Sequence, residues 1–115
     1  TTTSLNPKCT QNTLKGTYIY SVSGHIDGVP HFDSGKNIYD GAGNVKNIHI
    51  DASGNEKITE GTYTIGKYCA GFVKLHNQDS FAIYTGPKGD YIYDSSHADA
   101  SGTMIVGPEH RVSKR

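Results

Sequence analysis

The sequence is short of several residue types, and each shortage excludes a class of protein. Its 115 residues include no tryptophan and two cysteines, and Cys9 and Cys69 do not form a Cys-x-x-Cys pair, so a zinc ribbon or thioredoxin-like site has no support. No apolar run is long enough for a transmembrane helix, and no signal peptide is visible. Basic and acidic residues balance at 11 each, so nucleic acid is not expected as a partner.

The residues that are abundant are typical of a β protein. There are 14 glycines and eight tyrosines, the main aliphatic residues are isoleucine and valine, and the apolar periodicity of a helix is missing. The mean hydropathy is −0.55, and the length suits one domain. This composition predicts a single all-β domain of strands joined by tight turns.

Two similar loops organise the centre of the chain. Asp40-Gly-Ala-Gly-Asn44 and Asp51-Ala-Ser-Gly-Asn55 each fit a type I turn closed by a left-handed glycine. Pairing the flanking residues predicts a three-strand meander in which Lys46 opposes Glu60. One face of this meander carries Ile38, Lys46, Ile48, Ile50, Glu56, Ile58 and Glu60, and the other carries Asn37, Tyr39, Val45, Asn47, His49, Thr59 and Tyr63. The pattern leaves open which face is the interior.

Strand-like segments on either side of the meander complete the fold. They lie at 14–24, 36–40, 71–76, 80–85, 90–94 and 100–106, and Gly107-Pro108 is expected to end the last one. Segment 25–34, which contains Gly28 and Pro30, is interpreted as a loop or a broken edge. About eight strands with short connections predict an antiparallel up-and-down β-barrel, with a two-sheet β-sandwich as the alternative. The expected organisation is an N-terminal arm at 1–13, a barrel at 14–106 and a flexible tail at 107–115.

The two cysteines fit one structural disulfide that pins the arm to the barrel. Closing a loop of about sixty residues would stabilise the fold by roughly 4 kcal/mol in the chain-entropy model. Two unrelated buried thiols are the alternative. We expect a secreted or periplasmic protein, and the start at Thr1 is interpreted as a mature chain from which an export signal has been removed.

Catalytic and metal-binding motifs are missing from the sequence. The Asp–Asn loops are too short for an EF-hand, and turn formation accounts for their side chains. The six histidines show neither His-x-His nor His-x-x-x-His spacing. No Gly-x-Ser-x-Gly elbow is present. We predict no metal, no cofactor and no catalytic residue.

The candidate ligand site is a set of tyrosine and polar residues that share strand faces. If the tyrosine face is the interior, they would line an amphipathic pocket for a small apolar or aromatic ligand, in which a histidine could act as acid or base. The alternative is that the tyrosines only fill the core. The isoleucine face would then point outward and favour a protein partner or a homodimer. The predicted ligand-binding residues are Tyr18, Tyr20, Tyr39, Asn47, His49 and Tyr63.

Several strand and turn motifs stand out: Leu14-Lys-Gly-Thr-Tyr18, Tyr39-Asp-Gly-Ala-Gly-Asn-Val45, Glu60-Gly-Thr-Tyr-Thr-Ile65 with Cys69, and Ala100-Ser-Gly-Thr103. They resemble motifs of small exported bacterial β-barrel proteins, whose barrel is similar to that of allene oxide cyclases and dirigent proteins. The resemblance spans residues 9–106 and implies the barrel and the exported setting. No catalytic residue of the allene oxide cyclases can be placed on this chain. Gly-Thr-Tyr also resembles avidins, but the tryptophan walls of a biotin site are absent.

The expected function is therefore non-enzymatic binding of a small apolar or aromatic ligand or of a protein partner. The alternative is a cofactor-free isomerase or cyclase of the allene-oxide-cyclase-like type, in which the barrel interior supplies one acid or base. The interior distinguishes the two. A hydrated cavity with His49 or a tyrosine–carboxylate pair favours an enzyme, and a filled interior with an outer isoleucine patch favours a partner.

Overall fold

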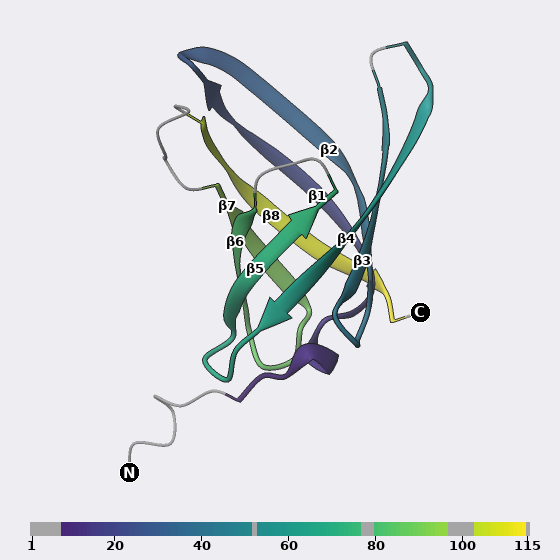
Figure 1. The fold of residues 1–115 in the computed structure, drawn as a ribbon, viewed down its shortest axis with the longest axis vertical. Coiled ribbons are helices and arrows are strands. Elements are labelled where there is room, and N and C mark those ends of the chain that lie inside the picture. The colour runs from purple at the N-terminus through teal and green to yellow at the C-terminus, as the bar shows by residue number, and fades with distance from the viewer. Residues whose placement is uncertain (1–7, 52, 77–79, 97–102, 115) are drawn as a thin grey trace.

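A computed structural model describes residues 8–51, 53–76, 80–96 and 103–114. Eight antiparallel strands form a closed barrel in which each strand pairs with its neighbours in sequence and β1 pairs with β8 (Figure 1). The predicted up-and-down barrel is confirmed. The strands are β1 (Lys15–Ile26), β2 (Val29–Asp40), β3 (Asn44–Ile50), β4 (Glu56–Ile65), β5 (Ala70–Leu75), β6 (Phe81–Thr85), β7 (Tyr91–Ser95) and β8 (Thr103–Ser113).

The meander has the predicted register. Lys46 pairs with Glu60, and β2 pairs with β3 through four residue pairs from Lys36–Ile48 to Tyr39–Val45. The Asp40 carboxylate accepts hydrogen bonds from the backbone amides of Ala42 and Asn44, at 2.7 and 3.0 Å. These bonds hold the loop as a turn. The prediction of a type I turn is wrong here, because Gly41 has φ +83° where a type I turn needs about −60°.

Two strand boundaries differ from the sequence prediction. Segment 25–34 belongs to β1 and β2, which form a long hairpin closed by Asp27 and Gly28 at φ 52° and 80°. Those angles are the two left-handed positions of a type I′ turn. Pro108 does not end the last strand, because β8 runs to Ser113 and pairs with both β7 and β1. The expected flexible tail is therefore strand from Gly107 to Ser113.

The tyrosine face is the interior. Tyr18, Tyr39 and Tyr63 are almost completely buried, and their rings meet edge to face with centroids 5.2 and 5.0 Å apart. Ile50 and Ile58 of the opposite face are 62% and 57% exposed. In the meander, the face that carries Tyr39 and Tyr63 is therefore the interior, and the face that carries Ile50 and Ile58 is the exterior.

The N-terminal arm closes one end of the barrel. Cys9 is bonded to Cys69, which confirms the predicted disulfide, and the short 3-10 helix η2 (Gln11–Thr13) follows at the lower end of the barrel in Figure 1. The Gln11 side chain accepts a hydrogen bond from Ile65 N at 2.6 Å and donates one to Tyr63 O at 2.8 Å. We call this the η2 end, and the opposite end, where the β1–β2 and β3–β4 hairpins diverge, the hairpin end.

Among the residues that the structure describes, no helix is long and apolar enough to span a membrane.

Candidate ligand-binding site

Two of the six predicted ligand residues, Tyr18 and Tyr63, lie in the core of the η2 end, and the Tyr39 ring packs against both. The Tyr63 hydroxyl lies 2.7 and 2.8 Å from the carbonyl oxygens of Gln11 and Leu14, and the Tyr18 hydroxyl donates to the carbonyl oxygen of Gly89. Burial raises the pKa of Tyr18 to about 12, against the lowering effect of nearby Arg111. These phenols are held by the backbone, so they fix the arm and the β6–β7 loop. Their contact with a ligand stays a prediction.

The other half of the barrel contains a buried polar network. Asn37 Nδ2 donates to Glu109 Oε1 at 3.0 Å, and the Tyr39 hydroxyl lies 3.2 Å from both oxygens of the same carboxyl group. Asn47 Nδ2 lies 2.9 Å from Asn37 Oδ1. The strand register explains this convergence, because Asn37 is paired with Asn47 across β2 and β3, and Glu109 lies on β8, which is joined to β2 through β1.

A second acid completes the network. Asp94 on β7 pairs with Gly107 on β8, and its carboxyl group lies within hydrogen-bonding reach of Glu109. Asp94 is 5% exposed and Glu109 is fully buried. Burial raises the pKa of both groups, and for Asp94 the neighbouring Glu109 charge raises it further. A proton held between the two carboxyl groups is the arrangement that burial favours, because a buried pair of carboxylate charges would repel.

One oxygen of this acid pair stands out. Oδ1 of Asp94 is buried and has no hydrogen-bond partner among the residues that the structure describes. A carboxyl oxygen without a donor in a buried position costs free energy. A proton on Glu109, or a donor group from a bound molecule, would satisfy it. The network is thus able to receive a hydrogen-bond donor.

The network extends to the surface at the hairpin end. Asn47 Nδ2 donates to the Tyr20 hydroxyl at 3.0 Å, and that hydroxyl donates to Asp33 Oδ2 at 3.2 Å. His49 Nδ1 lies 3.2 Å from Asn47 Oδ1. Tyr20, Asn47 and His49 are the remaining predicted site residues, so the structure brings these three together. Burial is the main reason that the pKa of Tyr20 is raised, which keeps its hydroxyl protonated as a donor.

A cleft of about 410 Å³ adjoins the outer end of this network. It is lined by residues of β1 and β2 and by Ile50 of β3, where β2 continues beyond its pairing with β3. Figure 1 shows that the β1–β2 and β3–β4 hairpins diverge at this end of the barrel. Phe32 and Ile50 border it and are 78% and 62% exposed. The cleft therefore combines apolar walls with the Asp33 carboxylate. Its lining residues are Ser21, Val22, Ser23, Phe32, Asp33, Ser34 and Ile50.

Sequence reasoning missed Asn37, Asp94 and Glu109 as members of a site. Asn37 was assigned to the same face as Tyr39, but no role was given to it. Glu109 fell in the expected tail, although continued alternation through 107–113 would have placed it on the inner face. Because acidic residues are rarely buried, however, the sequence alone favours an exposed position for Glu109.

Comparisons with known proteins give no family assignment. No family model, curated protein or solved structure matches the chain. In the part of the chain that the structure describes, no three His, Cys, Asp or Glu side chains lie close enough to hold a metal ion. The candidate site is therefore interpreted from its own residues.

Proposed function

We propose that this protein is a small exported binding protein that holds a small ligand at the hairpin end of its barrel. The ligand would have an apolar or aromatic body and at least one hydrogen-bond donor. The observation that supports this most directly is the cleft beside Asp33, where exposed apolar side chains border a polar network that leads into the barrel. The lining combines three apolar residues, Val22, Phe32 and Ile50, with four polar ones, and ligand sites use a few placed polar groups to fix the orientation of the ligand.

The two parts of the cleft would act differently. Phe32 and Ile50 would cover the apolar body of the ligand and lose exposed surface on binding. Asp33 and Tyr20 would orient its polar group, because both are already held by hydrogen bonds to the network. The disulfide between Cys9 and Cys69 is consistent with an oxidising compartment, which supports the exported setting.

Titration with a neutral fluorescent aryl amine, N-phenylnaphthylamine, tests this proposal, since it has both an apolar body and a donor. We expect saturable binding to the folded protein. Phe32→Ala should weaken it by at least about tenfold, because covering a phenylalanine contributes about 1.5–3 kcal/mol and 1.4 kcal/mol corresponds to a factor of ten. Asp33→Ala should weaken it by a smaller factor.

Tyr84→Ala is the matched control, because Tyr84 is another exposed aromatic residue, 49% exposed, on β6 outside the cleft lining. Equal losses in Phe32→Ala and Tyr84→Ala would show non-specific adsorption and would contradict the proposal. Native mass spectrometry before and after unfolding gives an independent test, because a natural ligand would leave with the unfolded chain.

A cofactor-free isomerase or cyclase of the allene-oxide-cyclase-like type is the second candidate function. The contact between the Tyr39 hydroxyl and Glu109 favours it, since a phenol beside a carboxyl group with a raised pKa is a possible acid–base pair. The two candidates differ in the molecule that they release. A binding protein releases its ligand unchanged, whereas an isomerase or cyclase releases an isomer of it. If the protein is the enzyme, Glu109→Gln would abolish the conversion.

The binding function could also be directed at a protein instead of a small ligand. The exposed isoleucines on the outer face favour this form, with a protein partner or a second copy of the chain. Ile19, Ile48 and Ile58 lie in one lateral row across β1, β3 and β4, with Lys36 of β2 between the first two. Ile19 is 46% exposed and Ile58 is 57% exposed. Sedimentation of the full chain with and without Ile58→Lys tests this form. A monomer in both cases would contradict the homodimer.

A further inference from the structure

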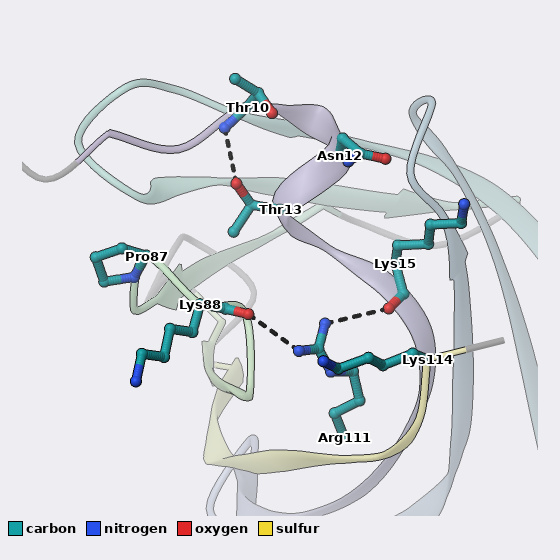
Figure 2. A pocket seen from close by; sticks show the side chains of 8 residues that line it. All are labelled: Thr10, Asn12, Thr13, Lys15, Pro87, Lys88, Arg111 and Lys114. Carbon is teal, nitrogen blue, oxygen red and sulfur yellow. Dashed lines mark hydrogen bonds between the residues drawn. The ribbon is translucent and has the colours of Figure 1, made fainter.

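The η2 end carries a second concave site that differs in chemistry from the cleft. It has a volume of about 400 Å³ and lies between η2, the β6–β7 loop and the end of β8 (Figure 2). This volume falls within the range of about 300–1,000 Å³ that is usual for small-molecule sites. We call it the basic pocket. Its lining residues are Thr10, Asn12, Thr13, Lys15, Pro87, Lys88, Arg111 and Lys114.

Arg111 holds two walls of the basic pocket together. Its guanidinium group donates to the carbonyl oxygens of Lys15 and Lys88 at 3.3 and 3.1 Å (Figure 2). It also donates to Asp90 Oδ1 at 2.8 Å. The Arg111 side chain is only 12% exposed. Because these donors are occupied, Arg111 positions the start of β1 against the β6–β7 loop and is not the main group available to a ligand.

Three lysines supply uncompensated positive charge. Lys15, Lys88 and Lys114 come from three different segments around the pocket (Figure 2). Among the described residues, none of their ammonium groups forms an ion pair. The Asp90 carboxylate is bonded to Arg111, and Asp40 is the cross-strand neighbour of Lys15. The formal charge of the whole chain is zero, so this concentration of charge is local. The ammonium groups of Lys15 and Lys88 point to opposite sides in Figure 2, and an anion bound between them would draw these flexible side chains together.

The remaining lining groups narrow the class of ligand. Thr10, Asn12 and Thr13 present hydroxyl and amide groups, which suit oxyanions. Pro87 is the one apolar residue in the lining and no aromatic residue is present, so a ligand that depends on ring stacking is not favoured. The wall of the pocket that η2 forms is held in place by the hydrogen bonds of the Gln11 side chain and by the disulfide at Cys9.

We propose that the basic pocket binds a compound that carries two or more phosphate or sulfate groups, with Lys15, Lys88 and Lys114 neutralising its charge. Free polyphosphates and sulfated oligosaccharides share this chemistry. The site is separate from the cleft at the hairpin end, so it does not depend on the function proposed there.

Titration of the full chain with sodium tripolyphosphate at low salt, followed by amide NMR, tests the proposal. We expect saturable shifts confined to residues around 10–15, 86–90 and 111–114. The double variant Lys88→Gln/Lys114→Gln should weaken binding by roughly twofold to thirtyfold, since each exposed ion pair contributes about 0.2–1 kcal/mol. Raising the salt concentration should weaken wild-type binding more steeply than binding by the variant.

The matched control is Lys46→Gln/Lys57→Gln, which removes the same charge from β3 and β4, outside the pocket. An unchanged affinity in this control supports the proposal, and a loss equal to that of Lys88→Gln/Lys114→Gln overturns it. A parallel titration with a heparin-derived hexasaccharide shows whether the pocket binds a sulfated oligosaccharide or a free polyphosphate more tightly. Absence of saturable binding by both probes at millimolar concentration would also overturn the proposal.

Discussion

At the scale of single residues, the acid pair of Asp94 and Glu109 makes stability depend on pH. Burial raises the pKa of both groups above their ordinary values of 3.8 and 4.5, so the folded state keeps protons that the unfolded chain has released. Their contribution is therefore complete below about pH 4 and is lost as the pH rises through the raised values. The loss is up to about 1.4 kcal/mol per pH unit for each proton retained.

Asp94→Asn should flatten this dependence, because the amide cannot ionise and can donate to Glu109. We expect urea unfolding to show a variant that is more stable than wild type at pH 9, with a smaller difference at pH 5. Asp27→Asn is the control, since Asp27 is exposed at the β1–β2 turn, and asparagine also tolerates a positive φ. A wild-type slope that Asp94→Asn leaves unaltered would contradict the shared-proton interpretation.

The same pair shows why part of the site was not predictable from sequence. Tyr20, Asn47 and His49 could be grouped because alternation along short strands is local information. Glu109 contacts Asn37 because β8 and β2 are both paired with β1, which lies between them. The residue pattern within a single strand does not indicate such a contact between distant strands. A buried acid is also stabilised only by its partners, which a single position does not show.

At the scale of the strands, close approach of β4 and β5 depends on glycine. A Cβ at Gly71 would lie 1.8 Å from the carbonyl oxygen of Thr64, and one at Gly61 would lie 2.3 Å from that of Lys74. Both contacts are with backbone of the paired strand, so neither neighbour can move without separating the two strands.

Gly71→Ala should therefore destabilise the protein by about 1–3 kcal/mol or more, as overpacking does. Gly66→Ala should change stability by less than about 0.5 kcal/mol, because its added Cβ would meet only Ala70 O at 3.5 Å. Thermal unfolding followed by circular dichroism measures both. Equal losses of stability in Gly71→Ala and Gly66→Ala would contradict the inference that the close approach of β4 and β5 requires glycine.

The meander was predictable from sequence and the first hairpin was not, for physical reasons. The Asp–Asn loops fix the register of β2, β3 and β4, which is why the pair Lys46–Glu60 is confirmed. In the first hairpin, Pro30 argued against a strand, since proline cannot donate a ladder hydrogen bond. The structure tolerates it because β2 has no pairing with β3 before Lys36, so that segment is an edge.

At the scale of the whole molecule, one covalent link joins the arm to the barrel. Cys9 and Cys69 are 60 residues apart in sequence and both are buried. Replacing both by alanine should lower the free energy of unfolding by roughly 4 kcal/mol in the chain-entropy model. Urea unfolding of Cys9→Ala/Cys69→Ala against wild type measures this. The variant should also be cleaved faster by protease within the arm, and unchanged stability would contradict the prediction.

The overall architecture followed from composition and turn spacing, because short connections force sequence neighbours to be neighbours in space. The exact strand ends did not follow, since they depend on pairing between β1 and β8, the first and last strands.

That closing contact has a consequence for how the chain reaches its native form. The strand that carries Glu109 is the last of the eight in chain order, and it pairs with both β1 and β7. If this strand docks last, its docking also removes water from the carboxyl pair, and two ionised carboxylates oppose that step. We therefore expect refolding after dilution from urea, followed by tyrosine fluorescence, to become slower as the pH rises.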